Sequence, residues 1–281
     1  MIRSAALIVF GILLAFSAWT IGGTAAWIYL ALYALAIAPG MPVGFALFGR
    51  DHAAAWIAGA VIGYALTAFA VWAPIAARVP SRLTFVAAWA ILTALAWFLS
   101  SKGSASLASL PRWTPAGSSA LLAVLVVTLA VAVPPLARVG RADAEGNRYY
   151  RAYFTADFVW HTALTSEIAK FSMPPRNPYL ARQPIHYYWT YYLLPAAISE
   201  TGPEPVRNVQ LCLKVNALMT GLLLMSAVFL AAWTVAGSAV ASGVAAALAL
   251  PRRAGRGCMR HTSCGREACH WRSCATGTSM R

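Results

Sequence analysis

Long apolar segments are the feature that most constrains the fold of this chain. They lie at about residues 5–21, 25–38, 53–75, 84–100, 118–137, 209–234 and 237–250. About 20 consecutive apolar residues cross the ~30 Å hydrocarbon core of a bilayer as an α-helix. Of the 281 residues, 60% are hydrophobic and only 11% are charged. The sequence therefore predicts an all-α fold, a polytopic membrane helical bundle in the cell membrane, of the kind found in a bacterial inner membrane.

The first two apolar segments are separated by Gly22 and Gly23. Glycine adopts backbone conformations that other residues avoid, so we expect two short helices joined by a tight turn, with a single tilted helix as the alternative. Arg3 before an apolar segment also resembles the start of a secretory signal. No convincing small-residue cleavage site follows it, and we therefore favour a retained first helix.

Four regions are expected along the chain. Residues 1–137 form the N-terminal transmembrane helices, and residues 138–200 form a polar, partly helical loop region that contains the candidate active site. Residues 201–250 form the C-terminal transmembrane helices, and residues 251–281 form an unstructured or frame-shifted tail. Within the loop region, the Tyr-rich stretch 186–199 is too short for a span and predicts an interfacial or re-entrant helix.

Basic residues in short loops indicate orientation, because they concentrate on the cytoplasmic side. With two helices before residue 38, one side holds Arg3, Arg50, Lys102 and Arg112, and the other holds Arg78 and Arg82. This distribution predicts that the loop region after residue 137 lies outside the cytoplasm. Arg138 and Arg141 argue for the opposite orientation.

The tail differs in composition from the rest of the chain. Residues 251–281 contain seven Arg, one Glu and four of the five Cys. Cys and His are the usual ligands of zinc, but the spacing of these Cys residues fits no common zinc module. A disulfide-bonded or unstructured basic tail is a second interpretation. A reading-frame change after Leu250 is the third, and it predicts that the chain is the N-terminal part of a longer membrane protein and is inactive or incomplete as it stands.

The net charge of +14 does not require a nucleic-acid partner. A membrane protein next to anionic lipid often carries such an excess of basic residues. The sequence also contains no recognised nucleic-acid-binding motif. We expect membrane lipid as a partner and no nucleic acid.

Chemistry is expected in the polar loop region, because ionisable groups beside a bilayer are costly and often functional. The absence of Pro and Gly from Thr155 to Phe171 predicts a short helix that Pro174–Pro175 ends. Asp157 and His161 are four residues apart and share a face of this helix, whereas Glu167 lies on another. An Asp–His pair suits proton transfer or binding of a divalent metal ion. A helix cap at the membrane interface is the structural alternative.

A Pro-rich connection then leads into an aromatic segment. Tyr187 and Tyr191, or Tyr188 and Tyr192, would stack on one face of a helix as a platform for a sugar ring or prenyl chain beside His186. An interfacial belt of Tyr and Trp explains the same residues without a ligand. Two arginines flank the Pro-rich turn, and their guanidinium groups suit a phosphate or lipid headgroups. They are Arg176 and Arg182.

The order of these residues resembles a known superfamily. An Asp followed by WH, EIAKF, PPRNPY and HYYWTYYLLPA is similar to the first catalytic-loop region of GT-C membrane glycosyltransferases. In particular, it resembles multi-span proteins with a YYY-type motif that are related to protein mannosyltransferases. The resemblance covers about 45 of the 281 residues.

The resemblance implies that a sugar is transferred from a polyprenyl-phosphate donor on the extracytoplasmic face. Asp157 would act as general base or metal contact, with assistance from His161. Glu167, Arg176, Arg182, His186, Tyr187, Tyr188 and Tyr191 would bind substrate. Many GT-C enzymes carry the catalytic acid after the first span, whereas several spans precede Asp157 in this chain. Other function classes that fit the sequence are a multi-span transporter and a noncatalytic membrane protein.

Overall fold

The structure is a computed structural model that describes residues 2–102, 110–148, 150, 157–180 and 182–250. These residues form helices and connecting segments, with two isolated bridges and no β-strand among them. The prediction of an all-α fold is therefore confirmed. The tail at 251–281, with the zinc, disulfide and reading-frame interpretations attached to it, lies outside the described residues.

Long helices make up the body of the molecule. They are α1 (Ile2–Ile37), α3 (Ala53–Ala76), α4 (Arg82–Lys102), α5 (Pro115–Arg138) and α8 (Val209–Ala236). The shorter elements are η1 (Ala38–Gly40), α2 (Met41–Phe48), α6 (Phe158–Ile168), η2 (Thr190–Tyr192), α7 (Leu193–Thr201), η3 (Glu204–Val206) and α9 (Ala239–Ala249). Within the described residues, five helical segments are long and apolar enough to cross a membrane, and α1 with α2 counts as one of them. The chain has the architecture of a multi-pass membrane protein.

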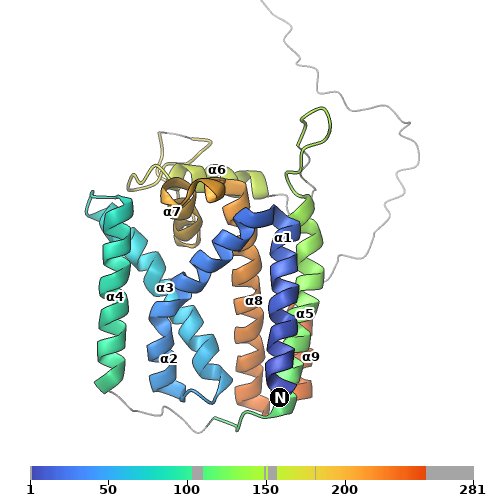
Figure 1. Cartoon of the computed structure of the whole chain (residues 1–281). Coiled ribbons are helices and arrows are strands. Elements are labelled where there is room, and N and C mark those ends of the chain that lie inside the picture. Colours follow the sequence, from blue (N-terminus) through green and yellow to red (C-terminus); the bar gives the residue numbers. More distant parts are fainter. Residues whose placement is uncertain (1, 103–109, 149, 151–156, 181, 251–281) are drawn as a thin grey trace, which may run out of the picture. The chain divides into compact units, whose positions relative to one another are not determined.

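Helix α1 is broken at Gly22 and Gly23, as the sequence predicts. Gly23 has a φ of 61°, in the region that favours glycine. The two halves of α1 run in different directions from this point (Figure 1). The indole nitrogen of Trp27 donates a hydrogen bond of 2.7 Å to the carbonyl oxygen of Ala15, which links the two halves across the break.

Glycines allow the segment formed by η1 and α2 to pack closely against α3. Gly40 and Gly44 are four residues apart, as are Gly59 and Gly63, and both pairs lie at the contact between the two segments. Small residues with this spacing let helix backbones approach each other within a membrane. A Cβ atom at Gly63 would overlap the carbonyl oxygen of Ile37. The two glycine pairs thus set the separation between the helices.

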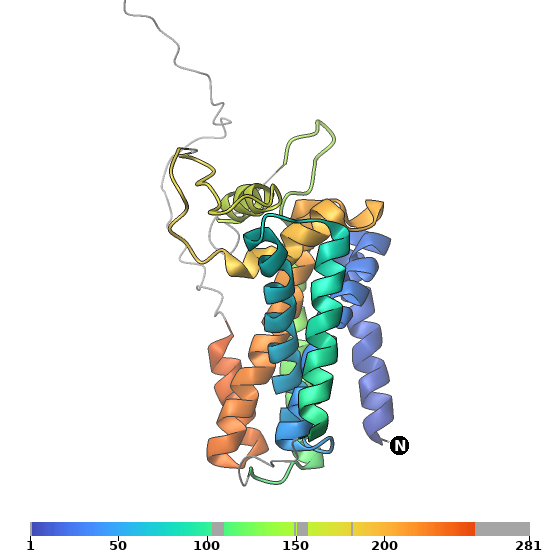
Figure 2. The same ribbon diagram turned by 90° about the vertical axis from the view of Figure 1, so that its left-hand side faces the viewer.

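The polar loop region lies at one end of the helical bundle. The segment between α5 and α8 runs over residues 139–208 and contains α6 and α7 (Figures 1 and 2). The turn between α3 and α4 lies at the same end, whereas the start of α1 and the turn at residues 49–52 lie at the opposite end (Figure 1). We refer to residues 139–208 as the cap.

This arrangement bears on the predicted orientation. Arg138 and Arg141 lie at the cap end, together with Arg78 and Arg82. With Arg207, just before α8, five basic residues lie near the span ends at the cap side, against Arg3, Arg50, Lys102 and Arg112 on the opposite side. The extracytoplasmic placement of the cap remains a prediction.

Apolar packing holds the cap against the bundle. Leu164 and Ile168 of α6 are buried in one hydrophobic cluster with Leu193 of α7 and Leu213 of α8. Phe171, which follows α6, meets Phe85 of α4 edge to face, with the ring centroids 5.1 Å apart. Helix α6 is therefore fixed on the end of the bundle, with its other faces available for polar groups.

Candidate functional site

Asp157 and His161 lie together at the N-terminal end of α6. Asp157 immediately precedes the helix, and its backbone oxygen accepts a 2.8 Å hydrogen bond from the backbone N–H of His161. The Asp157 side chain is exposed and forms no capping hydrogen bond. The expected helix to Phe171 is too long, because α6 ends at Ile168 and Phe171 has a φ of 53°. Its expected start at Thr155 lies outside the described residues.

Burial favours the neutral form of the half-buried His161 imidazole. Burial lowers the pKa of His161, and the nearby negative charge of Asp157 opposes this effect without cancelling it. The imidazole Nε2 lies 3.4 Å from the hydroxyl oxygen of Tyr187. A neutral imidazole next to an exposed carboxylate can accept a proton near neutral pH.

Tyr187 and Tyr188 form an aromatic platform beside His161. Their rings stack with centroids 4.0 Å apart, and the Tyr187 hydroxyl donates a 2.7 Å hydrogen bond to the Tyr188 hydroxyl. Burial, followed by the contact with Tyr188, raises the pKa of Tyr187 to about 12. Because the Tyr187 proton points to Tyr188, His161 is the donor in its contact with Tyr187. Its other ring nitrogen then carries the lone pair.

The expected stacking of tyrosines four residues apart is wrong. That expectation assumed one helix starting at residue 186. Residues 186–189 are not helical, and the next elements are the short 3₁₀ helix η2 and then α7. Tyr191 instead turns toward the bundle, where its hydroxyl lies 3.3 Å from the hydroxyl of Thr220. Neighbouring tyrosines form the platform, and Tyr191 anchors the cap to α8.

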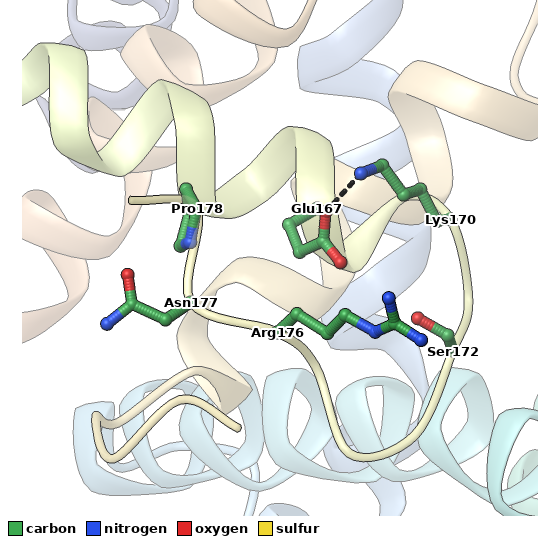
Figure 3. Close-up of a pocket in the computed structure, with 6 residues that line it drawn as sticks. All are labelled: Glu167, Lys170, Ser172, Arg176, Asn177 and Pro178. Carbon is green, nitrogen blue, oxygen red and sulfur yellow. Dashed lines mark hydrogen bonds and ion pairs between the residues drawn. The ribbon is translucent and has the colours of Figure 1, made fainter. Parts of the chain in front are cut away.

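A second polar cluster lies at the C-terminal end of α6. Glu167 is only 7% exposed and forms an ion pair with Lys170. Both residues line an open pocket of about 360 Å³, together with Ser172, Arg176, Asn177 and Pro178. The side chain of Arg176 extends beneath Glu167 toward Ser172 (Figure 3). This pocket is large enough for a small ligand and has cationic groups that suit an anion.

Arg176 and Arg182 lie on opposite arms of a hairpin-like turn. The backbones of Arg176 and Pro184 are bridged, and the N–H of Asn177 donates to the carbonyl oxygen of Gln183 at 2.9 Å. The ring of Tyr179 stacks on Trp160 of α6 with centroids 4.9 Å apart. The tip of the turn therefore lies near the N-terminal half of α6.

The exposed side chains of Arg182 and His186 form no hydrogen bond or ion pair with the other described residues. The predicted site residues thus separate into two groups. Ten residues of helix at 1.5 Å each place Asp157 about 15 Å from Glu167 along α6. The first group contains Asp157 and His161 with the aromatic platform, and the second contains Glu167 and Arg176. Asp157 is exposed whereas Glu167 is buried, in keeping with the expectation that they lie on different faces of α6.

A buried polar network supports the cap from below. Asn216 of α8 is fully buried, and its side-chain oxygen accepts hydrogen bonds from the hydroxyls of Tyr29 and Tyr64 at 3.1 and 3.3 Å. Tyr64 also lies 3.3 Å from the backbone oxygen of Tyr191. Helices α1, α3 and α8 are thereby connected to the base of the cap.

Within the described part of the chain, no group of three or more His, Cys, Asp and Glu is arranged to bind a metal ion. Asp157 and His161 would supply two protein ligands to a divalent metal ion. The remaining positions would come from substrate or water.

Sequence reasoning missed two lysines in this part of the molecule. Lys170 lines the pocket, and Lys214 is buried in α8. Lys214 had a visible signal, because it interrupts an apolar segment that is long enough to span a membrane. Lys170 had no such signal in the sequence, because an exposed Lys after a short helix is common.

Comparisons with protein-family models, with curated proteins and with solved structures give no match for this chain.

Proposed function

We propose that this chain is an integral membrane glycosyltransferase that takes its sugar from a polyprenyl-phosphate donor at the cap. The support is the position of the Asp157–His161 pair beside an aromatic platform, at one end of an apolar bundle. A prenyl chain stays in lipid, and its phosphosugar reaches the membrane surface. The site for such a donor must combine apolar helices with a few polar groups at their ends, which is the arrangement of this cap.

In the proposed reaction, Asp157 removes the proton from the acceptor hydroxyl. The acceptor oxygen then attacks the anomeric carbon of the sugar, and the bond between that carbon and the phosphate oxygen breaks. The electron pair leaves with the polyprenyl phosphate. His161 assists by accepting this proton from Asp157 on its free ring nitrogen, while the exposed face of Tyr188 stacks against the sugar ring. General-base catalysis of this type contributes about 10²- to 10⁴-fold to the rate.

The separation along α6 selects the arginine that holds the donor phosphate. The phosphate and the base act on opposite sides of one sugar carbon and must lie close together. Arg176 lines the pocket at the Glu167 end, about 15 Å from Asp157 along the helix. Arg182 follows Tyr179, which stacks on Trp160 near His161. We therefore assign the phosphate to Arg182.

A transporter is the second candidate function. The buried Tyr–Asn network favours it, because polar groups inside membrane spans often mark a substrate path. Asn216 and Tyr64, however, are hydrogen-bonded to each other, and the only fully buried side-chain N or O atom without a partner in the described residues is the hydroxyl of Tyr33. Because these side chains already have hydrogen-bond partners within the protein, we assign them to connecting the helices and not to binding a transported solute.

The test uses the chain reconstituted in liposomes with radiolabelled sugars linked to polyprenyl phosphate. We expect the label to leave the lipid fraction with these donors and to remain unused with nucleotide sugars. Arg182→Gln should weaken donor binding about 10- to 100-fold, since a charge-assisted contact contributes about 1.5–3 kcal/mol. The matched variant Arg176→Gln should bind the donor nearly as wild type does. If Arg176→Gln weakens donor binding and Arg182→Gln does not, the reaction takes place in the Glu167 pocket. If no lipid-linked donor loses its radiolabelled sugar, the proposal is excluded.

A further inference from the structure

Lys214 is a buried cation in the second turn of α8. Lys214 is only 8% exposed, and it lies in a helix that is apolar enough to cross a membrane. The ion pair between Lys170 and Glu167 is the one salt bridge of the described residues, so no described carboxylate pairs with Lys214. Burying a charge without a partner is costly. Such a residue needs a counter-charge from another molecule or a functional reason to persist.

The surroundings make this cation less favourable still. Lys214 lies near the N-terminus of α8, where the helix dipole is positive and favours anions. Arg148 adds a direct electrostatic repulsion. Three effects therefore oppose a positive charge at this position. Two of them, the helix dipole and Arg148, would favour a bound anion, and such an anion would also offset the cost of the buried charge.

The tip of Lys214 remains accessible to such an anion. Among the described residues, the hydroxyl of Tyr33 is the only fully buried side-chain N or O atom without a hydrogen-bond partner. The ammonium group of Lys214 makes no hydrogen bond to the described residues, and it must therefore reach accessible space.

Further polar groups border the same face of α8. Gln210 precedes Lys214 by one helical turn and faces the same way. Its side-chain nitrogen donates a 2.7 Å hydrogen bond to the hydroxyl of Tyr150. The guanidinium group of Arg148 donates to the backbone oxygen of Gly140 at 3.0 Å. These contacts bring the end of the 139–150 segment over α8, close to Lys214.

We propose that Lys214 and Arg148 bind the phosphate group of a membrane lipid at the cap end of α8. Phosphate is the anion that a bilayer presents at the depth where a membrane span begins. An ammonium and a guanidinium group suit it, and the guanidinium can donate two parallel hydrogen bonds. This inference is independent of the proposed glycosyltransferase activity, because any phospholipid carries the same group.

The test measures lipid binding to the full chain in neutral detergent by native mass spectrometry. The probe is dioleoyl phosphatidic acid, and dioleoylglycerol, which lacks only the phosphate, is the control lipid. Lys214→Met should weaken phosphatidic acid binding at least tenfold, and Arg148→Gln should weaken it several-fold. Arg141→Gln removes an equivalent charge from the same exposed segment and should have no effect. Binding should survive in Lys214→Arg, which keeps the charge.

Competition with inorganic phosphate identifies the source of the ligand. Displacement of phosphatidic acid only at a large excess of inorganic phosphate indicates a lipid-held group. Equal affinity for both ligands would overturn the assignment to a lipid. The site itself is disproved if Lys214→Met and Arg148→Gln bind phosphatidic acid like the wild type, or if dioleoylglycerol binds as well. If Lys214→Met fails to fold, Arg148→Gln and Lys214→Arg still decide the outcome.

Discussion

At the scale of single residues, the proposed chemistry depends on the charge state of His161. Burial lowers its pKa, and Asp157 limits the decrease. The folded protein therefore keeps this imidazole neutral to a lower pH than the unfolded chain, whose His pKa is about 6.5. The unfolded chain binds more protons below that pH. The contribution of His161 to stability is present above about pH 6.5 and is lost as the pH falls toward the folded pKa.

Asp157→Asn should lower the pKa of His161 further. The substitution removes the negative charge that favours the imidazolium form, while the burial that disfavours it stays. NMR titration of histidine-labelled protein measures this shift directly. An unchanged or higher pKa for His161 in the variant would show that Asp157 does not act on the imidazole.

Residue-scale contacts were only partly predictable from the sequence. The Asp157–His161 pair follows from the four-residue spacing, which a helix brings onto one face. The stack of Tyr187 on Tyr188 was not predictable, because it depends on residues 186–189 being non-helical. The separation of Arg176 from Asp157 depends on how the Pro-rich turn folds back, and local patterns do not encode that.

At the scale of helices, the packing of α3 against the end of α1 and against α2 depends on glycine. Gly63 lies against the carbonyl oxygen of Ile37, and Gly44 lies against the backbone of Ala55 and Gly59. The break at Gly22–Gly23 was predictable from two adjacent glycines between apolar segments. The helix contact itself was not inferred, because a glycine pair four residues apart indicates close packing without naming the partner.

Gly63→Ala should destabilise the protein by about 1–3 kcal/mol, because the added methyl group overpacks a helix contact. Gly221→Ala is a matched control in α8, since no atom lies within 4 Å of the added Cβ. It should be neutral or slightly stabilising, as Ala favours helix more than Gly does. Denaturation in detergent micelles measures both. Equal stability of the two variants would mean that Gly63 of α3 does not lie against the backbone of Ile37 at the end of α1.

At the scale of the whole molecule, the proposed sugar transfer requires the cap to face away from the cytoplasm. The apolar segments predicted the spans well, because a bilayer imposes both their length and their composition. They did not settle the orientation, since basic residues lie near the span ends on both sides.

Single cysteines in a cysteine-free variant test the orientation. Ser166→Cys places an exposed thiol on α6 in the cap, and Ser101→Cys places one at the opposite end of the bundle. An impermeant thiol reagent should label the first in intact cells and the second only after lysis. The opposite pattern would put the cap in the cytoplasm, where the proposed extracytoplasmic transfer could not occur.

The most direct measurement of the central claim compares sugar transfer by Asp157→Asn and Glu167→Gln under saturating polyprenyl-phosphate donor. Both changes are isosteric and remove only a carboxylate charge. If Asp157 is the base, its variant should lose at least a hundredfold in rate, while Glu167→Gln stays within tenfold of wild type. If instead Asp157→Asn keeps more than about a tenth of the rate, a barrier change under ~1.4 kcal/mol, and Glu167→Gln is inactive, the reaction belongs to the pocket at the other end of α6.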